Sequence, residues 1–149
     1  MPVKRIVSGG QTGADQTGLE VAKELGLETG GTAPKGYRTE TGPNLALRDI
    51  YGLKESIHWN YSYRTYVNVM DADGTVIFGD RNSAGSKQTI GDCSANGKRF
   101  LINPTSERLR EWIEEKNIQT LNVAGNRLSK NPGVVKLVRD TLMEALKSE

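Results

Sequence analysis

Apolar and polar residues alternate along the chain in blocks of two kinds. Four short apolar runs, at residues 3–7, 74–79, 98–103 and 119–125, have the length of buried strands. Apolar residues recur at helical spacing over residues 14–25, 106–116 and 132–146, and residues 83–96 are a further candidate helix. Strands that alternate with helices of about 10 to 15 residues are typical of βαβ units. The pattern therefore predicts a three-layer α/β fold, in which a mostly parallel sheet is flanked by helices on both faces.

Several segments carry further signals for helix ends and faces. In the last helix, Asn131 suits the N-cap and Pro132 suits the first helical position. Residues 61–70 are less regular, but one helical face there would hold Tyr63, Tyr66, Val67 and Met70. Residues 29–51 are rich in Gly, Pro and Thr and predict only a short strand near residues 31–33. A connection of that length inside a compact domain is usually functional or acts as a lid.

Composition limits the class of protein. With 149 residues, the chain fits one ligand-binding domain, residues 1–149, that can bury a core without disulfides. The net charge of +2 is too small to indicate nucleic acid, and no apolar run reaches the roughly 20 residues of a membrane span. The chain has one His and one Cys, Cys93, so it cannot form an internal disulfide or a Cys/His zinc site. We expect a cytoplasmic protein with no structural metal.

The stretch SGGQTGAD, residues 8–15, lies between the first predicted strand and the first helix. Gly9, Gly10 and Gly13 let the backbone adopt positive φ angles and let a ligand approach it closely. The free N–H groups at the start of the helix would face the same space, which favours an anion such as phosphate. The stretch matches neither the Walker A loop nor the dinucleotide-binding fingerprint, and a tight turn without a ligand is the alternative.

Three of the predicted strands end in glycine-containing loops, with the sequences VSGGQTG, IFGDRNSAG and VAGNR. In doubly wound folds, ligands bind at the carboxyl ends of the strands, where the strand order reverses. We therefore expect these three loops to converge on one edge of the sheet, and this convergence favours an anion site there over a simple turn.

Two charged segments are candidates for ligand contacts. Lys35, Arg38 and Glu40 lie close together in APKGYRTETGP and could grip a phosphate, although a solvated loop is the alternative. Asp71 and Asp73 in DADGT lack the later ligands of a calcium loop. A turn that enters a strand is the favoured interpretation of these two aspartates, with Mg²⁺ beside a phosphate as the alternative.

An aromatic group and a cysteine complete the candidates. His58, Trp59 and Tyr61 could stack on a flat heterocycle, although a core or subunit interface is the commoner role for such a group. Cys93 falls inside a predicted helix and is expected to be a small core residue.

Four blocks of the chain resemble one family, the molybdenum cofactor carriers. These form a circularly permuted, YpsA-like branch of the SLOG (lysine-decarboxylase-like) Rossmann superfamily. The blocks are IVSGGQTGAD, PKGYRTETGP, RTYVNVMDADGTVIF and LNVAGNRLSKNPGVVKLVRD, in the family's order and over most of the chain. The resemblance implies a Rossmann-like sheet with the ligand over its strand ends, and usually a homo-oligomer.

The resemblance also implies site residues. The third block contributes Arg64, Asn68, Asp71 and Asp73. Residues 82–89, NSAGSKQT, depart from the family's Gly-Gly-Thr run, so we expect the ligand's far end to be bound differently from the family's usual way. The residues that we expect to bind the ligand and its phosphate are Gly9, Gly10, Gln11, Thr12, Gly13, Asp15, Lys35, Gly36, Arg38, Glu40, Gly79, Ser83, Gly85, Ser86, Gly125 and Arg127. We make no assignment of catalytic residues.

Three functions remain open at this stage. The resemblance implies a carrier that holds the molybdenum cofactor (molybdopterin), a flat pterin with a phosphate, and passes it to molybdoenzyme acceptors. The second function is cleavage of a nucleoside monophosphate, with Glu40 or Asp15 at the ribose, although the phosphoribohydrolase motif Gly-Gly-x-Gly-Thr-x-x-Glu is missing. The third is a nucleotide-sensing or single-strand-binding module. We favour a small-ligand binder without catalysis, with a nucleotide as the alternative ligand.

Overall fold

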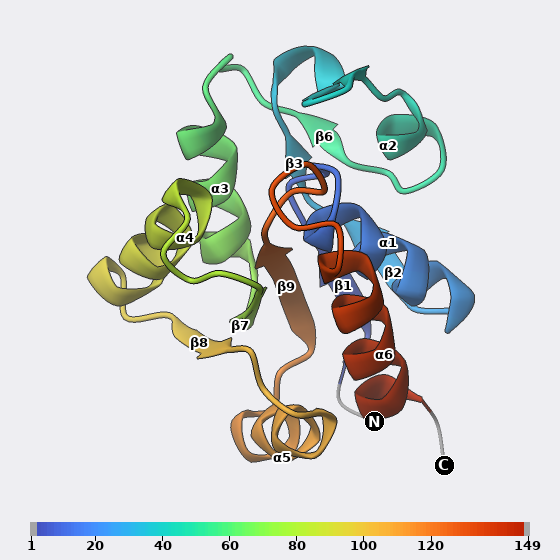
Figure 1. Ribbon diagram of the computed structural model, residues 1–149, viewed down its shortest axis with the longest axis vertical. Coiled ribbons are helices and arrows are strands. Elements are labelled where there is room, and N and C mark those ends of the chain that lie inside the picture. The colour runs from blue at the N-terminus through green and yellow to red at the C-terminus, as the bar shows by residue number, and fades with distance from the viewer. Residues whose placement is uncertain (1–2, 148–149) are drawn as a thin grey trace.

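A parallel sheet of five strands forms the centre of the molecule. The computed structural model describes residues 3–147. The strands β1 (Arg5–Val7), β2 (Glu28–Gly30), β7 (Gly74–Phe78), β8 (Arg99–Ile102) and β9 (Thr120–Gly125) pair in the order β2-β1-β9-β7-β8 (Figure 1). All four pairings are parallel. The chain builds outward from β1 to β2 on one side and from β7 to β8 on the other, and β9 returns between β1 and β7.

Helices cover both faces of this sheet, as the sequence predicts. On one face lie α1 (Ala14–Glu24), α5 (Ser106–Lys116) and α6 (Val134–Leu146), and on the other lie α3 (Tyr61–Asp71) and α4 (Ala84–Ala95) (Figure 1). With the short α2 (Ala46–Asp49), the protein has an α/β, Rossmann-like fold with six helices among its described residues.

The two faces of the sheet differ in polarity. Alternate residues of β9, Leu121 and Val123, pack into an apolar core with α1, α5 and α6. Asn122 points to the opposite face, where its Nδ2 donates a hydrogen bond of 3.2 Å to Thr75 Oγ1 of β7. Both polar residues are almost completely buried. The layer between the sheet and α3 and α4 is therefore built to hold polar groups.

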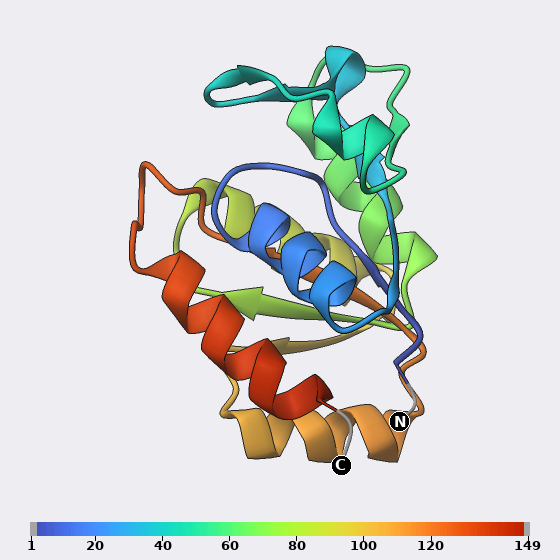
Figure 2. The ribbon, with the colours of Figure 1, turned by 90° about the vertical axis from the view of Figure 1, so that its right-hand side faces the viewer.

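Residues 31–58 form a cap segment beside α1, above the main sheet in Figure 2. It contains the parallel pair β3 (Thr32–Ala33) and β6 (Lys54–Glu55), the hairpin of β4 (Arg38–Thr39) and β5 (Gly42–Pro43), the 3₁₀ turn Lys35–Tyr37, and α2. A small cluster of Ala33, Tyr37, Leu47 and Leu53 packs on Leu19 of α1. The strand predicted near residues 31–33 is confirmed, and the other short elements of the cap carry too few residues to show a periodicity.

Two details of the sequence prediction are corrected. The last helix begins at Val134 with Gly133 as its N-cap, two residues after the predicted start. Asn131 does not cap this helix, because its side-chain amide donates to Asn126 Oδ1 at 3.2 Å and its carbonyl accepts from Val134 N.

The second correction concerns the buried face of α3. The face predicted from Tyr63, Tyr66, Val67 and Met70 is largely exposed. The helix instead turns Asn68 and Val69 inward.

No helix within residues 3–147 is both long enough and apolar enough to span a bilayer.

Candidate functional site

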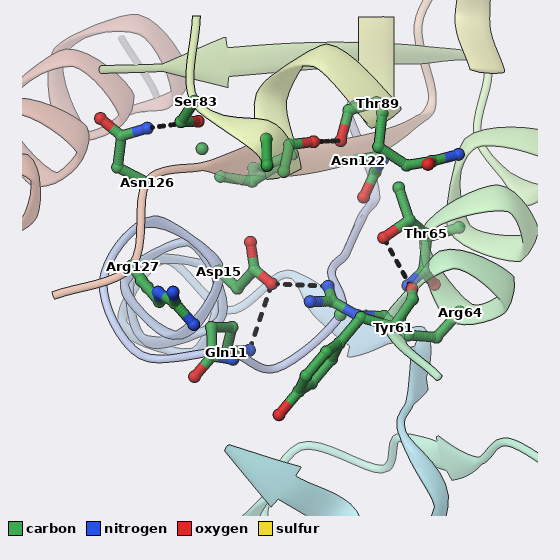
Figure 3. Close-up of a pocket in the computed structure, with 18 of the residues that line it drawn as sticks. Gln11, Asp15, Tyr61, Arg64, Thr65, Ser83, Thr89, Asn122, Asn126 and Arg127 are labelled. Atoms are coloured by element: carbon green, nitrogen blue, oxygen red, sulfur yellow. Dashed lines mark hydrogen bonds and ion pairs between the residues drawn. The ribbon is translucent and has the colours of Figure 1, made fainter. Parts of the chain in front are cut away.

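A cavity of about 760 Å³ opens at the carboxyl ends of β1, β7 and β9 (Figure 3). The loops that follow these three strands form its walls, together with the first turns of α1 and α4 and the inner face of α3. The three loops converge as the sequence predicts, because β9 lies between β1 and β7 in the sheet. The cavity thus lies where the strand order reverses, which is the usual ligand position in such folds.

The first wall holds a buried ion pair between Asp15 of α1 and Arg64 of α3. Arg64 Nη1 donates to Asp15 Oδ2 at 3.0 Å, and the Gln11 amide donates to the same oxygen at 3.1 Å (Figure 3). The side chains of Asp15 and Arg64 are only 6% and 14% exposed. Burial raises the pKa of the Asp15 carboxyl, and the charge of Arg64 opposes that shift.

Gly9 makes room for this pair. A Cβ at Gly9 would lie 1.7 Å from Arg64 Nη1, so the guanidinium passes directly over the glycine backbone. The ring of Tyr61 lies 5.4 Å from the Arg64 Cζ atom and also lines the cavity. The absence of a side chain at Gly9 therefore places a cation beside an aromatic ring in the cavity wall.

The first glycine loop uses most of its own amides to hold itself together. The amides of Gly10, Gln11, Thr12 and Ala14 donate to Ser8 Oγ, Asp15 Oδ2, Gln11 Oε1 and the Asn126 carbonyl, respectively. A bound anion would have to displace these acceptors. The amides of Gly9, Gly13 and Asp15 have no acceptor within residues 3–147.

The N-terminus of α4 offers further free donors to the cavity. Ala84 and Gly85 line the cavity, and their amides have no acceptor within residues 3–147. Ser83 caps the helix by accepting from Ser86 N at 3.2 Å. The first turn of α4 has no acidic residue of its own, so the positive end of the helix dipole faces the cavity, which the Asp80 carboxylate also lines.

Two cations reach the cavity from the loop after β9. Arg127 and Lys130 both line it, and Lys130 makes no ion pair within the part of the chain that is described. Asn126 joins this loop to the start of α4, because its side-chain oxygen accepts from Asp80 N at 2.6 Å and its Nδ2 donates to Ser83 Oγ at 3.1 Å. These bonds join the loop after β9 to the start of α4. We call the end of the cavity that these two segments form the anion-attracting end.

Glu40 connects the cap segment to the main domain. Its carboxylate accepts hydrogen bonds from Thr12 Oγ1, from Ser129 Oγ and from Ser129 N, the last at 3.0 Å. Arg127 Nε lies 3.6 Å from Glu40 Oε1. The hydrogen bonds from Ser129 and then Thr12 lower the pKa of Glu40. Glu40 thus holds the cap to the main domain from outside the cavity, and it places the Arg127 guanidinium at the cavity rim.

The other charged residues of the cap do not line the cavity. The Lys35 ammonium and the Arg38 guanidinium lie over the ring of Trp59, at 5.4 and 5.0 Å from its centroid. Gly36 N donates to Glu55 Oε2 at 2.7 Å. These contacts stabilise the cap itself.

The predicted site residues fall into two groups. Those that line the cavity are Gly9, Gln11, Asp15, Ser83, Gly85, Gly125 and Arg127. Those that lie outside its lining are Gly10, Thr12, Gly13, Lys35, Gly36, Arg38, Glu40, Gly79 and Ser86. Two of the second group support the walls: Gly13, with φ +85°, packs against the backbone of residues 126–128, and Ser86 is buried within the first turn of α4.

The third block of the resemblance divides in the same way. Arg64 and Asn68 line the cavity. Asp73 lies at the opposite edge of the sheet, where its Oδ2 accepts from the amides of Gln119 and Thr120. Asp73 therefore has the turn role that the sequence favours.

Some cavity residues were absent from the sequence prediction. Asn122 is a polar residue within an apolar strand, which could have marked it. Lys130 is an ordinary loop lysine in the sequence. Within residues 3–147, no group of three or more His, Cys, Asp or Glu side chains is placed to hold a metal ion.

Comparisons with known proteins agree with this architecture. No curated protein matches the chain significantly. A solved structure that does match is that of a "putative molybdenum carrier protein" from Syntrophus aciditrophicus SB, with a TM-score of 0.89 and 33% sequence identity. The match covers 97% of this chain and 96% of that one. Residues 6–146 match the circularly permutated YpsA SLOG family, and the chain therefore belongs to that family.

Proposed function

We propose that this protein binds the molybdenum cofactor, as molybdopterin or its molybdenum complex, and carries it to molybdoenzyme acceptors. The observation that supports this most strongly is a cavity that joins an anion-attracting end to a wall with an aromatic ring. A phosphorylated pterin has the same two parts. The volume of the cavity, about 760 Å³, is within the range of small-molecule sites.

The phosphate belongs at the N-terminus of α4 in this proposal. The amides of Ala84 and Gly85 would donate to it, and Lys130 and Arg127 would balance its charge. This arrangement replaces the glycine run of related proteins, of which only Gly85 remains here. The ring belongs at the wall formed by Tyr61, Arg64 and Asp15.

A role in carriage rather than catalysis is supported by the state of the acidic groups. Asp15 already holds Arg64 and the Gln11 amide, and Glu40 is held by Thr12 and Ser129 outside the cavity. Glu40 therefore cannot act on a ligand in the cavity, and two donors already hold Asp15 Oδ2, which supports binding by Asp15 rather than proton transfer.

A charge reversal at Gly85 tests the proposal. No atom lies within 4 Å of a Cβ at Gly85, and an aspartate in the first turn of a helix favours folding. Gly85→Asp should therefore fold normally but repel the phosphate. Gly91→Asp is the matched control, because Gly91 is exposed on the same helix, also has open space, and receives the same charge.

The assay is an anaerobic binding titration with the purified cofactor. We expect the wild type and Gly91→Asp to bind it, and Gly85→Asp to bind at least about tenfold more weakly. No binding by the wild type would refute the proposed function. Equal weakening by both variants would refute the placement of the phosphate.

A nucleotide is the second candidate ligand, because a nucleoside monophosphate also combines a flat ring with a phosphate. Asp15, which lines the cavity, would then face the ribose of a substrate, whereas Glu40 lies outside the lining. Incubation of the protein with nucleoside monophosphates, followed by analysis for the free base, tests the hydrolase function. Release of base at a rate proportional to protein concentration would replace the carrier proposal by this one.

We also propose that the chain acts as one cytoplasmic domain within a homo-oligomer. Five large apolar or aromatic side chains are exposed along α3 and the segment before it: Ile57, Trp59, Tyr63, Tyr66 and Met70. We call this set the α3 patch. Exposed apolar side chains gathered on one segment support a contact with another subunit.

A further inference from the structure

We infer that Asp15 recognises the N–H edge of the ligand's ring, so that the ring is a 2-amino-4-oxopyrimidine, the edge that pterins and guanine share. This inference rests on the proposed function, because it assumes that a ring occupies the wall beside Tyr61 and Arg64. It goes further by naming the residue that determines specificity and the chemical group that this residue selects.

The two oxygens of the Asp15 carboxylate have different surroundings. Oδ2 accepts from Arg64 Nη1 and from Gln11 N, whereas Oδ1 accepts no hydrogen bond from any residue within 3–147. Figure 3 shows both dashed lines ending on one oxygen, while the other points away from Arg64 into the cavity. Oδ1 is not fully enclosed by the protein, so a ligand in the cavity can reach it.

A purely structural role would not require this second oxygen. The cap on Gln11 N and the ion pair with Arg64 both use Oδ2. An unpaired oxygen on a carboxylate that is only 6% exposed loses hydration without gaining a partner. An N–H donor from a bound ligand would remove that cost.

A second acceptor lies in the same cavity. Asn122 Nδ2 donates to Thr75 Oγ1, and the Asn122 side-chain oxygen accepts no hydrogen bond from a described residue. Two free acceptors, one of them charged, call for a ligand edge with adjacent N–H donors. Arg64 already balances the charge of Asp15, so the edge can be neutral.

The 2-amino-4-oxopyrimidine edge meets this requirement. It presents a ring N–H beside an exocyclic amino group, and these two donors match the two free acceptors, Asp15 Oδ1 and the Asn122 side-chain oxygen. When oxygen replaces the amino group, as in lumazine or xanthine, an acceptor faces the carboxylate instead. A buried polar group that is left facing another acceptor discriminates strongly against the wrong ring.

The experiment compares two pairs of rings in fluorescence or calorimetric titrations. One pair is 6-hydroxymethylpterin phosphate and its lumazine counterpart, and the other is GMP and XMP. The proteins are the wild type, Asp15→Asn and the control Asp80→Asn, which removes a different carboxylate of the cavity lining. The wild type should bind the amino ring of a pair at least about tenfold more tightly than the oxo ring.

Asparagine at position 15 offers an N–H donor as well as an acceptor, so Asp15→Asn should level or reverse this preference. Asp80→Asn should change the affinity for both rings of a pair by the same factor. Equal binding of the two rings by the wild type would overturn the inference, and this measurement stands even if Asp15→Asn fails to fold. A folded Asp15→Asn protein that keeps the wild-type preference would also overturn it.

The two proposals can fail separately. Binding of pterin and lumazine phosphates with equal affinity would leave the carrier function standing and remove the role of Asp15. Binding of GMP over XMP without any binding of the pterin would support the role of Asp15 and contradict the carrier function.

Discussion

Replacement of Gly9 by alanine should break the Asp15–Arg64 pair without disturbing the backbone. The φ angle of Gly9 lies outside the left-handed region, so the main chain accepts alanine. The new Cβ would lie 1.7 Å from Arg64 Nη1, and an ordinary contact begins at 3.4 Å, so the guanidinium must move by about 1.7 Å. The bond from Nη1 to Asp15 Oδ2, now 3.0 Å, cannot survive that shift.

The energy at stake is that of a hydrogen bond between charged groups, about 1.5–3 kcal/mol. We therefore expect Gly9→Ala to lower the free energy of unfolding by about that amount in urea denaturation. Gly91→Ala is the control, because it is an exposed helical glycine with nothing within 4 Å of its Cβ. It should raise the free energy of unfolding by up to about 1 kcal/mol through helix propensity alone.

A double-mutant cycle separates this mechanism from other effects of the methyl group. In an Arg64→Ala background there is no guanidinium to displace, so Gly9→Ala should cost less than about 0.5 kcal/mol. If Gly9→Ala cost the same in both backgrounds, the pair would not be the reason for the glycine, and the reasoning would be refuted.

Three further predictions follow from contacts around the cavity. Because the pKa of Glu40 is lowered, its carboxylate stabilises the fold at pH values above the ordinary glutamate pKa, and this contribution is lost as the pH falls through the lowered value. The wild type should therefore have a higher melting temperature than Glu40→Gln at neutral pH. A difference in melting temperature that persists undiminished in acid would contradict this role of Glu40. Asn126→Ala should lower the free energy of unfolding by about 1–3 kcal/mol, because the Asp80 amide loses its acceptor; an effect below about 0.5 kcal/mol in urea denaturation would contradict this. Tyr66→Lys places a charge in the α3 patch and should reduce the mass measured by light scattering to that of one chain, whereas a wild type that is already monomeric would remove the proposed subunit contact.

The layered fold could be predicted because its signals are local. The strands at residues 74–79 and 119–125 are short apolar runs between turns, and the helix at 106–116 carries a regular apolar stripe. The position of the cavity followed from the same signals, because parallel strands bring their carboxyl ends to one edge.

The partners within the site could not be predicted, because they are far apart in the sequence. Asp15 and Arg64 are separated by 49 residues, and Glu40 and Ser129 by 89. The glycines of the first loop illustrate the difficulty. Their number predicted an open anion site, but Gly9 accommodates Arg64, and Gly13 accommodates the backbone of the loop after β9. Only the folded chain shows that the amides of Ala84 and Gly85 at the start of α4 also face the cavity without an acceptor among residues 3–147.

The most direct test of the proposed function is native mass spectrometry of the protein purified without oxygen. Each subunit is weighed against the mass of the bare chain, and any retained ligand is released and identified. We predict a retained mass that proves to be a phosphorylated pterin, with or without molybdenum. A retained nucleotide, or an empty subunit that later takes up nucleotides but no pterin, would contradict the carrier function.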